Sequence, residues 1–131
     1  MRRRQKGFTL LELIIVIIVI GILASIALPR FLRVTEKARV AEAKSSLGVI
    51  RSAQLRYKAQ YGNYSGDINA LDTDLDSKYF SCNATDGTGS IVGTCSRLTA
   101  VEYGLAAGDY DVEITEDGQI NVSNPALSYL L

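Results

Sequence analysis

The chain is long enough for one domain, and its charges balance overall but not along its length. It has 131 residues, with 14 Lys and Arg, 14 Asp and Glu, two Cys and no His. Without His, a Ser/His or Cys/His nucleophile is impossible, and no phosphate loop or helical metal-ligand pair appears, so we predict neither an enzyme nor a cofactor. Residues 59–131 carry 11 acidic residues against two basic ones, and such a region does not attract nucleic acid by its charge.

Residues 1–28 have the character of a targeting segment. Four basic residues stand in a leader, residues 1–7, and are expected to stay on the cytoplasmic side of a membrane. An apolar stretch of 21 residues follows at 8–28, about 32 Å long as a helix, which is enough to span a bilayer. Two ordinary interpretations are a permanent anchor and a secretory signal cleaved after Ser25-Ile26-Ala27.

Glu12 has no role in either of these interpretations. The sixteen residues Leu13 to Leu28 carry no charge, and a carboxylate inside a membrane helix costs a few kcal/mol or more unless it is paired. The position of Glu12, five residues after Gly7, allows one specific partner: the α-amine that a cut between Gly7 and Phe8 would expose. We therefore interpret Glu12 as a functional residue.

The segment KGFTLLELIIVIIVIGILASIALPRF, residues 6–31, resembles the N-terminal signature of type IV pilins and of the pseudopilins of type II secretion systems. The resemblance implies that a membrane-embedded prepilin peptidase removes residues 1–7 by cutting after Gly7, and that Phe8 is then N-methylated. It also implies that Glu12 pairs with the N-terminal amine of a neighbouring subunit as copies of the chain assemble, on an inner-membrane platform, into a helical filament. Methylation leaves the amine charged, and a misplaced subunit would leave a buried charge unpaired, so the pair would set the register.

The helix is expected to bend at Gly21 or Pro29 and to continue as an amphipathic helix over residues 29–61. Pro29 lacks an N–H and frees the carbonyl of Ser25, and the resemblance implies that this region can unwind in a filament. Beyond Pro29, residues for packing recur every three or four positions: Val40, Ala43, Leu47, Ile50, Gln54, Tyr57, Tyr61 and Tyr64. Gly62 then supplies a stop signal.

Residues 62–97 are rich in turn-forming residues and are predicted to be a loop region. The acidic run DTDLD, residues 72–76, lacks the later Gly and Glu of an EF-hand loop, so we favour a solvated turn over a metal site. Cys82 and Cys95 are the only cysteines. A domain exported across a membrane meets oxidising surroundings, so we expect these two cysteines to form a disulfide.

Residues 98–131 are predicted to form an antiparallel β-sheet and a C-terminal tail. The segments SRLTAVEYGL, DYDVEIT and QINVS alternate in part and are rich in β-branched and aromatic residues, and Asp117-Gly118 between the last two is a hairpin signal. Their apolar face, with Val112 and Ile114, is the expected cover for the helical stripe. The predicted fold class is α+β, the pilin fold, in which a long helix, transmembrane in its first half, packs by its second half against a small sheet.

Three functions are compatible with these features. The first is a structural subunit of a type IV pilus, held in the inner membrane as a precursor and then part of an extracellular filament for adhesion, twitching motility or DNA uptake. The second is a pseudopilin of a type II secretion system, in a short periplasmic filament. The third is a monomeric secreted or anchored binding domain with a conventional signal. The disulfide loop and the lack of a recognisable calcium-binding C-terminus favour the pilin.

Overall fold

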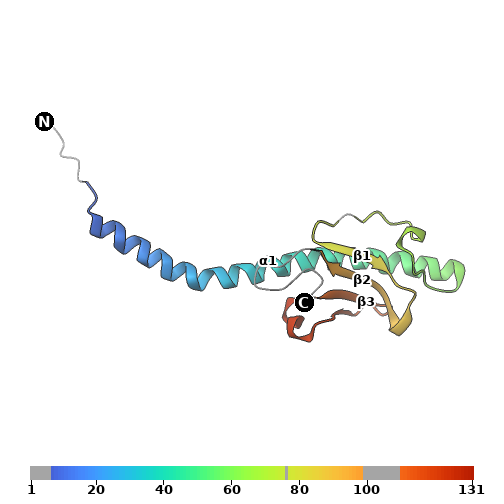
Figure 1. The fold of residues 1–131 in the computed structure, drawn as a ribbon. Coiled ribbons are helices and arrows are strands. Elements are labelled where there is room, and N and C mark those ends of the chain that lie inside the picture. Colours follow the sequence, from blue (N-terminus) through green and yellow to red (C-terminus); the bar gives the residue numbers. More distant parts are fainter. Residues whose placement is uncertain (1–6, 76, 99–109) are drawn as a thin grey trace. The chain divides into compact units, whose positions relative to one another are not determined.

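The computed structural model describes residues 7–75, 77–98 and 110–131. The chain divides into two compact units, one ending at Val34 and the other beginning at Thr35. A single long helix, α1 (Leu10–Tyr61), contributes residues to both units and runs from blue to green in Figure 1. In the second unit, which we call the head, the described residues also form a four-stranded sheet and three short 3₁₀-helices.

The first unit contains the apolar part of α1. Its large apolar side chains between Leu10 and Leu28 are from 38% to 76% exposed. They are distributed around the whole helix, and a helix that is apolar on all sides requires an apolar environment. α1 remains helical through Pro29.

In the head, α1 buries one face. The buried residues recur at helical spacing: Glu36, Val40, Ala43, Leu47, Ile50, Ala53 and Gln54. The predicted stripe is confirmed from Val40 to Gln54. It is wrong for Tyr61, which is 59% exposed. The ring of Tyr61 contacts the ring of Tyr57, one helical turn earlier, with ring centroids 4.5 Å apart. The stop signal is confirmed: Gly62 has a φ of 85°, and its N–H donates to the carbonyl of Lys58 (2.8 Å).

Gln54 is a fully buried polar residue that ties α1 to the loops of the head. Its amide nitrogen lies within hydrogen-bonding distance of the carbonyls of Ser65 (2.7 Å), Thr85 (2.9 Å) and Val92 (3.1 Å). Its amide oxygen accepts from the N–H of Ser65 (2.9 Å). Because both ends of the amide are bonded, its burial carries no desolvation penalty of the kind an unpaired amide would suffer.

The sheet has four antiparallel strands in the order β1-β2-β3-β4. They are β1 (Phe80–Ala84), β2 (Ile91–Arg97), β3 (Asp111–Thr115) and β4 (Ile120–Val122). Figure 1 shows β1, β2 and β3 along the head's part of α1. Val112 and Ile114 are buried as predicted, and Gly118 turns the chain between β3 and β4 with a φ of 88°. The hairpin and the α+β class are therefore confirmed, and the architecture is consistent with the pilin fold.

The strands begin earlier in the chain than the sequence indicates. We expect a loop over residues 62–97, yet β1 and β2 both lie inside this range. Their sequences, FSCNA and IVGTCSR, contain Gly, Asn and Ser, which are weak strand formers, and burial against α1 overrides that propensity. Of the expected strand SRLTAVEYGL, Ser96 and Arg97 complete β2, and residues 99–105 lie outside the described residues.

The expected disulfide is present. Cys82 on β1 and Cys95 on β2 are direct partners in the strand register and are bonded to each other. The two residues are 13 apart in sequence, and closing a loop of that size contributes about 3 kcal/mol in the chain-entropy model. The cross-link therefore holds β1 to β2 directly.

Candidate functional site

The predicted cleavage point lies just ahead of α1. Gly7, Phe8 and Thr9 have no helical structure and are exposed, and Phe8 is 89% exposed. Exposed, non-helical backbone is the kind of segment that proteases reach most readily. Residues 1–6 of the predicted leader lie outside the described residues.

Glu12 and Thr9 form a capping box at the start of α1. The N–H and the hydroxyl of Thr9 both donate to Oε2 of Glu12 (3.3 Å each), and the N–H of Glu12 donates to the hydroxyl oxygen of Thr9 (3.2 Å). Each residue thus satisfies a backbone donor that the first helical turn leaves without a partner. Thr9 was not predicted as a partner of Glu12, although Thr9-Leu10-Leu11-Glu12 has the spacing of a capping box.

Glu12 retains hydrogen-bonding capacity after capping the helix. Both bonds from Thr9 go to Oε2, and Oε1 accepts no hydrogen bond from any residue that the structure describes. An ionised carboxylate can accept about four hydrogen bonds. The structure therefore leaves one oxygen of Glu12 open to a donor from outside the chain.

The surface that follows Glu12 is suited to a membrane. Among the described residues, α1 is the one helix that is long and apolar enough to cross a bilayer, and none of its apolar window is buried. Gly21 lies in this part of the helix, and a Cβ added there would meet no other atom within 4 Å. The hydroxyl of Ser25 donates back to the carbonyl of Ile22 (2.7 Å). A bend at Gly21 or Pro29 stays a prediction.

The head contains a buried charged cluster that the sequence analysis missed. Glu36 is 4% exposed and Arg97 is 2% exposed. Oε1 of Glu36 accepts from Nε of Arg97 (2.8 Å) and from the hydroxyl of Tyr110 (2.5 Å). Oε2 accepts from Nη2 of Arg97 (3.2 Å) and from Nη1 of Arg39 (3.1 Å). One carboxylate therefore connects α1 to the end of β2 and to the residue before β3.

The surroundings of this cluster set the protonation states of Glu36 and Tyr110. Burial by itself raises the pKa of Glu36, but the hydrogen bonds from Arg97 and Tyr110, with the charge of Arg97, outweigh it and hold the pKa below the ordinary value of 4.5. Burial, together with the hydrogen bond to Glu36, raises the pKa of Tyr110 well above its ordinary value of 10.0. At neutral pH, Glu36 is thus ionised and Tyr110 is a neutral donor.

The similarity of this chain to known proteins extends from the N-terminal segment into the head. A family model described as the prokaryotic N-terminal methylation motif matches residues 2–28. The chain is also 32% identical over 109 residues to the fimbrial protein EcpC of Eikenella corrodens, a match that covers 80% of this chain and 71% of that protein. The chain belongs to the family of type IV pilins and pseudopilins. Its resemblance to that family, read from residues 6–31, is confirmed.

Two further relatives represent the two branches of the pilin and pseudopilin family. The chain is 40% identical over 68 residues to the type IV major pilin protein PilA of Myxococcus xanthus, and 39% identical over 71 residues to the type II secretion system core protein G of Aeromonas hydrophila. These matches cover 52% and 54% of this chain, but 31% and 50% of the two relatives. The chain thus spans half or less of the length of these two relatives, so the two matches support the family and not the assembly that each relative forms.

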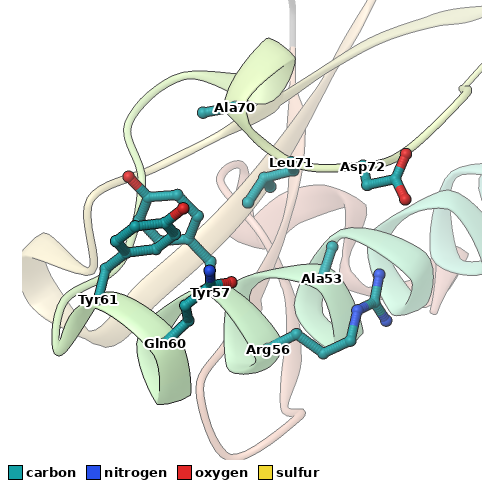
Figure 2. A pocket seen from close by; sticks show the side chains of 8 residues that line it. All are labelled: Ala53, Arg56, Tyr57, Gln60, Tyr61, Ala70, Leu71 and Asp72. Atoms are coloured by element: carbon teal, nitrogen blue, oxygen red, sulfur yellow. The ribbon is translucent and has the colours of Figure 1, made fainter.

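A hollow of the pilin head lies near the C-terminal end of α1, opposite η1 (Ile68–Ala70), and has a cavity volume of about 160 Å³. Figure 2 shows the rings of Tyr57 and Tyr61 at one side of it and the charged groups of Arg56 and Asp72 at the other. This volume is below the roughly 300–1,000 Å³ typical of pockets for small molecules. Among the described residues, no group of three acidic, Cys or His side chains is placed to hold a metal ion.

Proposed function

We propose that the chain is the structural subunit of a type IV pilus, in which the apolar part of α1 forms the filament core. The observation that supports this most is the surface between Leu10 and Leu28, where every large apolar side chain is at least 38% exposed. Such a surface needs lipid in the precursor and other copies of the same helix in the filament. Membership of the pilin and pseudopilin family supports assembly of this kind.

In this proposal, a prepilin peptidase cuts after Gly7 and Phe8 is N-methylated. Thr9 remains in the mature chain, so the capping box with Glu12 is retained. Oε1 of Glu12 then accepts a hydrogen bond from the methylated ammonium group of Phe8 in a neighbouring subunit. Because a subunit out of register would leave a buried charge unpaired, the contact sets the axial position of each subunit more than it adds net stability.

The location of the protein follows from the same proposal. The precursor stands in the inner membrane with its basic leader on the cytoplasmic side, and an inner-membrane platform adds it to an extracellular filament. Adhesion, twitching motility and DNA uptake are the proposed uses of that filament. No residue of the chain is assigned a catalytic role.

A pseudopilin of a type II secretion system is the second candidate, and the 39% identity to core protein G supports it. A pseudopilin would form a short periplasmic filament, whereas a pilin forms long filaments on the cell surface. Electron microscopy of cells carrying an epitope tag on the C-terminal residue separates these two outcomes, because labelled surface filaments are expected only for the pilin.

The test of the proposal is the intact mass and N-terminal sequence of the mature protein. A chain that begins at N-methylated Phe8 is the expected result. A chain that begins at Leu28 would mean that the apolar helix is a cleaved signal and that the protein is a monomeric secreted domain. That result would overturn the filament core and the role given to Glu12.

A further inference from the structure

We propose that the hollow between α1 and η1 binds one neutral pyranose ring, the six-membered ring of a sugar. The residues that line the hollow run from Ala53 to Asp72 and all belong to the head. The inference goes beyond the proposed function and does not depend on it, because it requires only that the head is folded.

The size of the hollow suits a ligand of one ring. Its volume of about 160 Å³ is the volume of about five water molecules, which is too small for an oligosaccharide. Its floor is apolar, since the lining residues Ala53 and Leu71 are 3% and 4% exposed. A sugar ring can rest on such a floor with the C–H groups of one face.

Two tyrosine rings form one side of the hollow (Figure 2). Tyr57 and Tyr61 are one helical turn apart on α1, and their ring centroids are 4.5 Å apart. Tyr61 is 59% exposed, so much of its ring is open to a ligand. The face of an aromatic ring is negative and attracts the weakly positive C–H groups of a sugar. This side of the hollow therefore offers a surface for stacking.

The polar groups around the hollow have no partner within the described part of the chain. The side chains of Arg56, Gln60 and Asp72 form no hydrogen bond or ion pair with any residue that the structure describes, and neither do the hydroxyls of Tyr57 and Tyr61. Arg56 and Asp72 thus carry opposite charges at one hollow without forming an ion pair. Both groups are available to a ligand that bridges them.

Two other cations of the same helix are bound by the head itself. Nζ of Lys44 donates to the carbonyl of Leu131 (2.9 Å). Nε of Arg51 donates to the carbonyl of Glu116 (2.9 Å). These contacts fix α1 to the rest of the head, whereas the guanidinium group of Arg56 has no such structural use among the described residues.

The mixture of donors and acceptors favours a neutral sugar over a zwitterion. A sugar hydroxyl both donates and accepts, so neighbouring hydroxyls can accept from Arg56 and donate to the carboxylate of Asp72. The amide of Gln60 and the two tyrosine hydroxyls also offer donors and acceptors. An amino acid, whose two charges lie at one end, would leave those uncharged groups without partners. One positive and one negative side chain also give the site no net charge, which suits a neutral ligand.

The test is a titration of the ¹⁵N-labelled full-length chain with methyl β-D-galactopyranoside and, separately, with methyl β-D-glucopyranoside. The chain is held in micelles of a detergent that has no sugar headgroup. The amide chemical shifts report both the affinity and the place of binding. We expect at least one of the two sugars to shift amides among residues 53–72, with a dissociation constant of roughly 1 mM, as for other ligands of this size.

Variants at the surface of the hollow separate the contacts. Asp72→Ala removes the acceptor of a charge-assisted hydrogen bond and should weaken binding about tenfold. Asp74→Ala is the matched control, because Asp74 is also exposed but does not line the hollow, and it should bind like wild type. Tyr61→Ala removes a stacking ring and should weaken binding about fivefold, whereas Tyr61→Phe keeps the ring and should retain most of the affinity.

Three results would overturn the inference. The first is the absence of shifts with both sugars at roughly 50 mM, far above the expected dissociation constant. The second is equal affinity of Asp72→Ala and Asp74→Ala, because the sugar would then bind elsewhere. The third is tighter binding of phenylalanine than of either sugar, because Arg56 and Asp72 would then hold a zwitterion. A mature chain that begins at methylated Phe8 but binds no sugar would overturn this inference alone.

Discussion

Glu12 and Glu36 are carboxylates on the same helix, and their partners lie at very different distances along the chain. Glu12 caps the helix with Thr9, three residues earlier. Glu36 is held by Arg97 and Tyr110, which lie 61 and 74 residues later. The first partner can be found from a local pattern, whereas the second exists only once the strands are in place. Glu36 does leave one trace in the sequence, since it extends the buried stripe by four residues ahead of Val40.

Tyr110→Phe should destabilise the head. The change removes a hydrogen bond to an ionised carboxylate, and such bonds contribute about 1.5–3 kcal/mol. The measurement is urea unfolding of the full chain in detergent micelles. The difference in the free energy of unfolding between wild type and Tyr110→Phe gives the contribution of the hydroxyl. Tyr61→Phe is the control, because Tyr61 is 59% exposed and the change should alter stability little. Equal stability of Tyr110→Phe and wild type would mean that the Tyr110 hydroxyl adds nothing to the cluster.

The same cluster predicts a loss of stability in acid. The pKa of Glu36 in the folded head is below its ordinary value of 4.5, so the unfolded chain binds more protons as the pH falls. The contribution of Glu36 is therefore fully present above about pH 4.5 and is lost as the pH falls through the lowered value. Hydrogen bonds from Thr88 also lower the pKa of Asp86, so Asp86 adds to the loss of stability in acid. The measurement is therefore the slope of the free energy of unfolding against pH, compared between wild type and Glu36→Gln. A Glu36→Gln chain whose free energy of unfolding falls with pH as steeply as that of wild type would contradict the prediction.

At the scale of elements, the close contact between α1 and β2 depends on one glycine. Gly93 on β2 sits against Ile50 and Leu47 of α1, and a Cβ at this position would meet Cγ2 of Ile50 at 2.8 Å. The absence of a side chain lets the strand approach the helix closely. That role is not visible in the local sequence, where a Gly between Val92 and Thr94 indicates a turn as readily as a buried strand.

Gly93→Ala should therefore destabilise the head by about 1–3 kcal/mol, the usual cost of overpacking a core. Gly48→Ala on the exposed face of α1 is the matched control. No atom lies within 4 Å of a Cβ at position 48, and replacing a helical Gly by Ala stabilises by up to about 1 kcal/mol. Thermal unfolding of the two variants should thus shift in opposite directions. A Gly93→Ala chain that unfolds at or above the wild-type temperature would show that the α1–β2 contact tolerates a methyl group.

At the scale of the whole molecule, the two units are stable in different surroundings. The head satisfies its own buried polar groups, including Gln54 and the Glu36 cluster. The apolar part of α1 has no buried residue among those described before Val34. A unit of this kind cannot be stable in water alone, so its surroundings have to be supplied by lipid or by other copies of the chain.

Glu12→Gln should separate the two roles of Glu12 in assembly. Gln keeps the capping box but removes the charge proposed to pair with the Phe8 ammonium group, so the precursor should be inserted and processed while few filaments form. Thr9→Val is the converse variant. It loses the cap, at a cost of about 1 kcal/mol, but keeps the carboxylate and should still assemble. Immunoblots of sheared surface filaments against whole-cell protein measure both. Normal filaments from Glu12→Gln would remove the pairing role.

Local patterns in the sequence were sufficient to predict the long helix, its apolar and amphipathic parts, its stop at Gly62 and the β3–β4 hairpin, because each depends on local spacing or on residues with one dominant conformational preference. The disulfide could be predicted because the chain has two cysteines and a segment for export. Three features became known from the fold: Phe80–Ala84 and Ile91–Arg97 are strands, Tyr61 faces outward, and Glu36, Arg97 and Tyr110 share one buried site. These features depend on contacts between residues far apart in the chain, where burial against α1 outweighs local propensity.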